Sequence, residues 1–218
     1  KKDTRHLDLE DCIVYREKEN LLDMIATLDR FDPISLDEMD SVALLKRTDT
    51  KFIVNEKNLF KVLDSIHNDY RVLEIAGDRL MSYNSLYFDT ENKKLYNDHH
   101  NGRVKRLKVR VREYVESARC YLEIKQKDSK GDTHKSRIRI PTFETELSES
   151  SKQFIKETIK TDIDLVPVIR TTFNRFTLVS KTRPERVTID LKLHFNIKDS
   201  VEYDGKDLEK PPYEGLGI

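Results

Sequence analysis

The sequence RLKVRVREY, residues 106–114, alternates basic and apolar side chains through its first seven positions. Successive side chains of a β-strand point to opposite faces of the sheet. A strand here would place four cations on one face and apolar side chains on the other, the cations being Arg106, Lys108, Arg110 and Arg112. This pattern predicts a strand whose apolar face packs on a core and whose basic face meets solvent or an anion.

Other stretches show the same division into an ionic and an apolar face: residues 47–54, 121–127, 135–140 and 186–195. An open antiparallel sheet with one solvated face explains such alternation. A barrel closed around a polar lumen, with helices covering its apolar outside, explains it as well. No acid lies between Lys108 and Arg112, and arginine is favoured where phosphate or carboxylate is gripped by two hydrogen bonds. This detail favours a basic lumen that binds a polyanion.

Composition limits the class of protein. The 218 residues, 37% of them hydrophobic, suffice for one domain with a sizeable core. Forty basic and 40 acidic residues cancel, so net charge predicts neither nucleic-acid nor membrane binding. Two cysteines indicate neither a disulfide framework nor a zinc site and favour a reducing compartment. With no long apolar run or signal-peptide pattern, we expect a soluble cytoplasmic protein.

The order of elements predicts an α+β fold dominated by an antiparallel sheet. Helices are expected at 9–28, 55–69, 90–97 and 148–160, and strands at 47–54, 71–76, 80–89, 106–114, 119–127, 134–140, 166–179 and 186–195. The first helix is expected to lie outside the main fold. We predict an acidic helical segment at 1–42, a barrel domain at 43–200 and an irregular C-terminal tail at 201–218.

Seven motifs in order carry a family resemblance: RTDTKF, LYFDT, KVRVREY, YLEIKQK, THKSRIRI, TTFNRF and RVTIDLKL. Together they resemble the VTC (vacuolar transporter chaperone) catalytic domain, a member of the triphosphate tunnel metalloenzymes. The match runs from about Arg47 to Phe195. The resemblance implies an antiparallel eight-stranded barrel with helices packed outside, and a polyphosphate polymerase that transfers the γ-phosphate of ATP to a growing polyphosphate chain.

The resemblance also implies which residues carry the chemistry. By this resemblance, the catalytic residues that bind phosphate are Lys51, Arg110, Arg112, Lys125, Arg175 and Arg186. Further contacts to substrate are expected from Arg47, Lys108, Glu123, Lys135, Arg137 and Lys192. The strands at 119–127 and 134–140 are expected to form a hairpin. Arg137 then matches the family's next basic position, or Lys135 does if the register of this hairpin slips by two residues. Arg47 stands where the superfamily has the first acid of its Glu-x-Glu-x-Lys strand, which removes one metal ligand.

Phosphoryl transfer depends mainly on alignment and on neutralising charge, which cations and a divalent ion can supply. Mn²⁺ or Mg²⁺ suits carboxylate and phosphate oxygens. Glu123 and Asp190 are the remaining candidate metal ligands, although salt bridges to nearby arginines explain them equally well. The family's further strand with a Glu-x-Lys pair has no counterpart in residues 201–218, so either the chain is shortened or the barrel is open.

Three functions stay open: the polymerase, a metal-dependent triphosphate hydrolase, and a non-catalytic module that binds polyphosphate or nucleotide. The expected ligands are ATP or triphosphate and inorganic polyphosphate, with a membrane protein as a partner and no nucleic acid. Replacing Arg110 and Arg112 with Ala is expected to abolish triphosphate binding and leave the fold intact, on the premise that neither side chain contacts the core. Asp89 or Thr90 is expected to cap the helix that follows.

Overall fold

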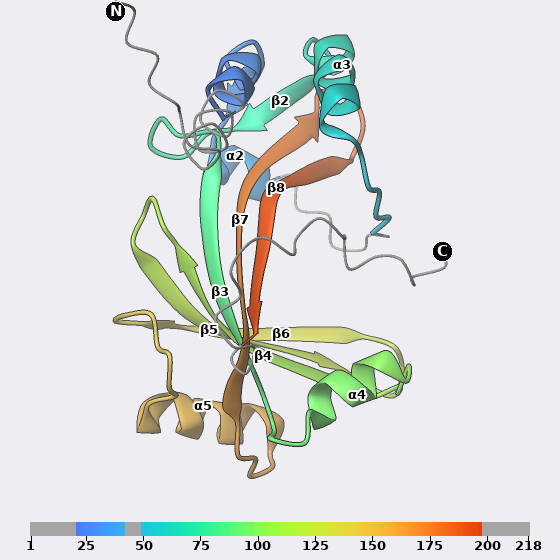
Figure 1. Ribbon diagram of the computed structural model, residues 1–218. Coiled ribbons are helices and arrows are strands. Elements are labelled where there is room, and N and C mark those ends of the chain that lie inside the picture. The colour runs from blue at the N-terminus through green and yellow to red at the C-terminus, as the bar shows by residue number, and fades with distance from the viewer. Residues whose placement is uncertain (1–20, 42–48, 198–218) are drawn as a thin grey trace, which may run out of the picture. The chain divides into compact units, whose positions relative to one another are not determined.

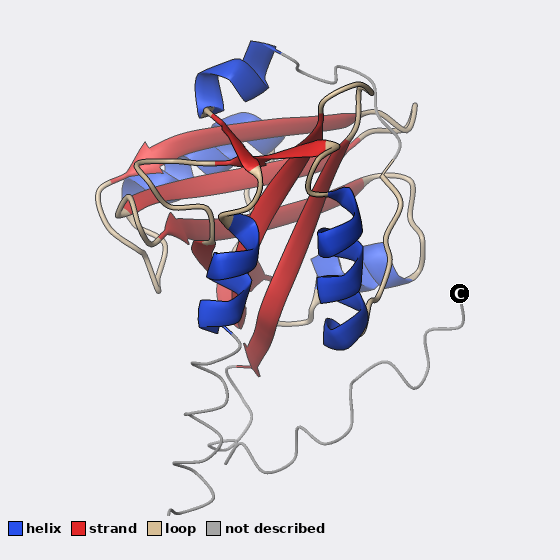
Figure 2. Cartoon of the chain, turned by 90° about the horizontal axis from the view of Figure 1, so that it is seen from above, coloured by secondary structure: helices blue, strands red, loops and turns tan. Residues whose placement is uncertain are grey.

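The computed structural model describes residues 21–41 and 49–197, which form helices and strands (Figures 1 and 2). Eight strands form one sheet in the order β1-β2-β7-β3-β4-β5-β6, with β8 paired to β7. The α+β fold class and the dominant antiparallel eight-stranded sheet are therefore confirmed. No helix in this part of the chain is both long enough and apolar enough to cross a bilayer.

The strand bounds follow the predicted ones closely at the centre of the sheet. The strands are β1 (Asp32–Ile34), β2 (Tyr70–Leu73), β3 (Met81–Asp89), β4 (Arg106–Tyr114), β5 (Arg119–Lys127), β6 (Thr133–Ile140), β7 (Val166–Ser180) and β8 (Arg186–Ile197). The pairs β2–β7, β3–β4, β4–β5 and β5–β6 are antiparallel, whereas the short β1 pairs with β2 in parallel. The strand β1 and the helix α2 (Leu36–Ser41) were not predicted.

The described residues divide into two compact units, one formed by residues 21–41, 49–81 and 174–191 and the other by residues 82–173 and 192–197. The first unit contains a helix at 21–28, the helix α3 (Glu56–Ile66) and β2. Its core joins Met24 and Leu28 of the first helix to Leu63 of α3 and to Phe176 of β7. The predicted domain boundaries near 42 and 200 lie outside the described residues and stay a prediction.

The helix at 21–28 belongs to the core of this unit, which corrects the expectation that it lies outside the main fold. Met24 is 1% exposed and Leu28 is fully buried. The sequence places Leu22, Ile25 and Leu28 at helical spacing, which predicts that all three face inward, but Leu22 and Ile25 are 66% and 42% exposed. This helix has apolar residues on more than one side. Periodicity alone therefore did not identify Met24 as one of the residues that pack against the core.

The second unit contains β3 to β6, the helices α4 (Lys94–His100) and α5 (Glu149–Ile159), and the first half of β7. Apolar side chains of the strands form its core, including Phe88, Val111 and Leu122, and Ile155 of α5 packs against them. Ser148 caps α5, because its hydroxyl accepts a hydrogen bond from the backbone of Ser151. Through Ile155, the helix α5 covers the apolar face of the sheet in this unit, as the family resemblance implied.

The predicted strand at 47–54 is wrong for the residues that the structure describes. Residues 49–55 have no regular secondary structure, and Phe52 and Ile53 are each 81% exposed. Alternation of polar and apolar side chains reflects only a local preference for extended backbone. A strand also needs a neighbouring strand that pairs with its backbone N–H and C=O groups.

The predicted two-faced pattern of β8 holds for only part of the strand. Ile189 and Leu191 pack against the core of the first unit, but Leu193 and Phe195 are 42% and 47% exposed. Lys192 adopts a left-handed backbone conformation with φ of 50°, and it is half-buried like its neighbour Leu191. A residue in this conformation interrupts the regular reversal of side chains along a strand.

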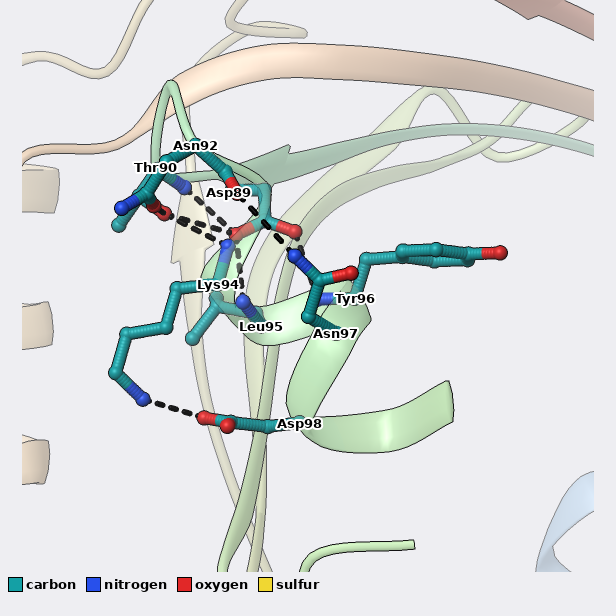
Figure 3. Close-up of polar contacts among 8 residues, drawn as sticks. All are labelled: Asp89, Thr90, Asn92, Lys94, Leu95, Tyr96, Asn97 and Asp98. Atoms are coloured by element: carbon teal, nitrogen blue, oxygen red, sulfur yellow. Dashed lines mark hydrogen bonds and ion pairs between the residues drawn. The ribbon is translucent and has the colours of Figure 1, made fainter. Parts of the chain in front are cut away.

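The helix α4 is held by Asp89, a buried residue at the end of β3 (Figure 3). The Asp89 carboxylate accepts hydrogen bonds from the backbone nitrogens of Thr90, Leu95 and Tyr96 at 2.7–2.8 Å. The Thr90 hydroxyl accepts a further bond from the Lys94 backbone at 3.0 Å. Both expected capping residues therefore take part, although the helix begins four residues later than predicted.

Candidate phosphate-binding site

The strands β4, β5 and β6 carry what we call the basic face, defined by Lys108, Arg110, Arg112, Glu123, Lys125, Lys135 and Arg137. Antiparallel pairing places residues of neighbouring strands directly opposite each other, with their side chains on the same face. The register aligns Lys108 with Lys125 and Lys135, then Arg110 with Glu123 and Arg137, and then Arg112 with Tyr121 and Arg139. The face therefore consists of successive rows that cross three strands.

The first of these rows consists of three lysines. Lys108, Lys125 and Lys135 are all exposed, while Val109 and Ile124 beside them are buried on the opposite face. Like charges directly opposite each other destabilise a sheet. The row concentrates positive charge on the exposed face, and a phosphate group would complement this charge.

The next row centres on an ion pair between Arg110 and Glu123. One carboxylate oxygen of Glu123 accepts from Arg110 Nε at 2.8 Å and lies 2.6 Å from Arg110 Nη2, while Arg110 Nη1 donates to the Tyr87 hydroxyl at 2.9 Å. Burial alone would lower the pKa of Arg110, but the nearby Tyr87 and Glu123 outweigh it and raise that pKa. All three nitrogens of this guanidinium therefore have protein partners.

Arg112 is the most enclosed cation of the basic face, with 7% of its surface exposed. Its Nε donates to the Ser85 hydroxyl at 2.9 Å, and its guanidinium carbon lies 5.1 Å and 5.7 Å from the ring centres of Tyr83 and Phe173. Burial, and then the charge of Arg110, lower the pKa of Arg112. The premise that Arg112 makes no core contact is therefore wrong.

Comparison of the sequence with known families gives a match to the VTC domain over residues 46–214, about three quarters of the chain. The chain belongs to the VTC domain family. This family lies within the triphosphate tunnel superfamily, whose ligands are phosphates and nucleotides and whose members typically use divalent metals. No curated protein matches the sequence.

Two solved structures resemble this VTC domain weakly. A conserved hypothetical protein from Pyrococcus furiosus has a TM-score of 0.32 and 10% identity, with 56% of this chain and 66% of the other covered. A proposed adenylate cyclase from Vibrio parahaemolyticus has a TM-score of 0.30 and 10% identity, with 64% and 71% covered. The chain thus spans just under two thirds of the Pyrococcus protein.

The site residues predicted in the first unit are arranged differently from those on the basic face. Arg175 of β7 holds both carboxylate oxygens of Asp190 of β8, at 2.5 Å and 2.7 Å. Lys51 and Arg186 are exposed, and Lys51 lies in the segment without regular structure. Arg47 lies outside the described residues. The roles of these residues in phosphate binding stay a prediction.

Neither candidate metal ligand forms part of a metal site in the described part of the VTC domain. Glu123 pairs with Arg110, and Asp190 pairs with Arg175. Within residues 21–41 and 49–197, no group of three or more His, Cys, Asp or Glu side chains is placed to hold a metal ion. The described carboxylates therefore form no such cluster for the divalent metal that the family typically uses; metal binding by Glu123 and Asp190 stays a prediction, and we assign no step to the metal.

Four residues that the sequence did not single out as site residues lie in the rows of the basic face or against them. Ser85 and Tyr87 of β3 pair with Arg112 and Arg110, and Tyr121 and Arg139 lie in the Arg112 row. The Arg137 guanidinium carbon lies 5.0 Å from the Tyr121 ring centre. Their strands were predicted, so the missing information was the register between strands, which places side chains opposite each other.

Proposed function

We propose that this VTC domain is a polyphosphate polymerase, which transfers the γ-phosphate of ATP to the end of a polyphosphate chain held on the basic face. The observation that carries the proposal is the lysine row, in which Lys108, Lys125 and Lys135 lie directly opposite one another. A phosphate chain supplies negative charge that complements the positive charge of this row, and membership of the VTC family supports the same ligand class.

In the proposed reaction, an anionic oxygen of the terminal phosphate attacks the γ-phosphorus of ATP. A new P–O–P bond forms as the bond between the γ-phosphorus and the β,γ-bridging oxygen breaks. ADP leaves with the electron pair of that bond, and the chain becomes one phosphate longer. The attacking group is already ionised, so no strong base is required, and the cations contribute by aligning phosphates and neutralising their charge.

The experiment is an incubation of the purified chain with ATP, carried out separately with Mn²⁺ and with Mg²⁺. Gel electrophoresis detects polyphosphate, and a colorimetric assay detects free phosphate. We expect polyphosphate and ADP from the wild type and a strong loss of product from the Lys125→Gln, Lys135→Gln double variant. Release of free phosphate without polyphosphate would overturn the polymerase in favour of the triphosphate hydrolase.

A non-catalytic module that binds polyphosphate or nucleotide is the second candidate. The ion pairs of Glu123 with Arg110 and of Asp190 with Arg175 favour it, because they engage the carboxylates that a metal would need. In that case triphosphate would bind to the basic face, and neither ADP nor free phosphate would accumulate in the same incubation.

A further inference from the structure

Glu123 is the one acid in the three aligned rows, and it interrupts an otherwise cationic or aromatic surface. In its row it lies directly between Arg110 and Arg137, with lysines in the row on one side and Arg112 and Arg139 in the row on the other. Its side chain is only partly exposed, at 19%. A carboxylate here faces any phosphate chain that extends from the lysine row to Arg112.

The Glu123 carboxylate also occupies the part of Arg110 that a phosphate would use. Arginine binds phosphate through two parallel N–H groups. On Arg110 two such nitrogens, Nε and Nη2, already lie 2.8 Å and 2.6 Å from one Glu123 oxygen, and Nη1 donates one of its two N–H groups to the Tyr87 hydroxyl. A phosphate can bind the Nε–Nη2 side of Arg110 only by displacing the Glu123 carboxylate, so Glu123 competes with phosphate for that side of the guanidinium.

We propose that Glu123 is a specificity-determining residue that limits how tightly extended phosphate chains are held, by competing for Arg110 and by repelling phosphates that cross its row. This inference rests on the proposed function. A single phosphate can bind at the lysine row without meeting Glu123. A chain long enough to reach Arg112 has to pass it, so the penalty depends on chain length. Such a restraint would help a growing chain to advance and dissociate.

The test compares binding of tripolyphosphate and of orthophosphate to the wild type and to Glu123→Gln, by calorimetry in metal-free buffer. Glutamine can still accept a hydrogen bond from Arg110, so this variant removes the charge and retains a partner that holds Arg110. We expect tripolyphosphate to bind about tenfold more tightly, because a competitor and a repulsion are lost together, and orthophosphate to change by less than about threefold.

Glu113→Gln is the matched control, because Glu113 lies on β4 in the same unit but pairs with Cys120 of the apolar face. Its carboxylate accepts from the Asn84 amide at 2.9 Å, and glutamine can retain that bond. We expect unchanged binding of both ligands. A purely structural role for Glu123 would change both ligands alike, and the length dependence distinguishes the two.

Weaker or unchanged tripolyphosphate binding by Glu123→Gln would overturn the inference, and so would an equal gain for both ligands. If the wild type binds tripolyphosphate but the variant shows no length-dependent gain, the inference fails and the proposed function stands. If the wild type binds no tripolyphosphate, the proposed function itself fails and the inference falls with it.

Discussion

At the residue scale, the two arginines of the KVRVREY motif have different surroundings. Arg110 is bound by a carboxylate and a phenol, whereas Arg112 lies beside two aromatic rings and donates to a buried serine. A cation beside aromatic faces stabilises the fold as well as attracting anions. Arg112 therefore has a structural role that the alternating sequence did not reveal.

Replacing Arg112 with Ala should lower the free energy of unfolding by about 2 kcal/mol, because it removes two cation–aromatic contacts and leaves the fully buried Ser85 hydroxyl without its donor. Urea denaturation measures this change. Arg139→Ala is the control: Arg139 lies in the same row but is exposed, and its replacement should change stability by less than about 0.5 kcal/mol. Equal effects of the two variants would contradict the structural role of Arg112.

At the element scale, α4 is a seven-residue helix whose N-terminus depends on a side chain from the preceding strand. Helices this short are not stable alone, and their first backbone N–H groups need acceptors. Asp89 supplies two of these acceptor contacts from a position that is 3% exposed (Figure 3). The connection between β3 and β4 is thereby fixed at one end of the strand pair that bears the arginines.

Asp89→Ala should therefore destabilise the protein by about 2 kcal/mol and speed hydrogen exchange at the Leu95 and Tyr96 amides, because both lose a buried acceptor. Amide exchange followed by NMR measures the local effect. Asp98→Ala, which removes only the exposed pair with Lys94, should cost about 0.5 kcal/mol and leave those two amides protected. Unchanged exchange in the Asp89 variant would contradict the capping role.

At the scale of the whole molecule, the sequence predicted β4 and β5 to the residue, because their alternation is regular and turn signals bound them. Their ionic and apolar faces were also assigned correctly. The register between the strands could not be predicted, because alternation defines the face on which a side chain lies but not its neighbour across the sheet. For this reason the three rows, the Arg110–Glu123 pair and the contacts of Arg112 emerged only with the register.

The same limit explains the errors elsewhere in the chain. The segment around Lys51 has the alternation of a strand but no strand in the described residues, and the helix at 21–28 packs through Met24, which the helical spacing did not select. Both outcomes depend on which partner each segment meets. Local sequence preferences do not contain that information.

Titration of tripolyphosphate into the wild type and into Lys125→Gln tests the central claim, that the basic face binds a chain of phosphates, most directly. We expect the variant to bind about tenfold more weakly, because the central lysine of its row is lost. Lys152→Gln, on the exposed surface of α5, should bind like the wild type. Equal affinity of the wild type and Lys125→Gln would contradict phosphate binding at the basic face.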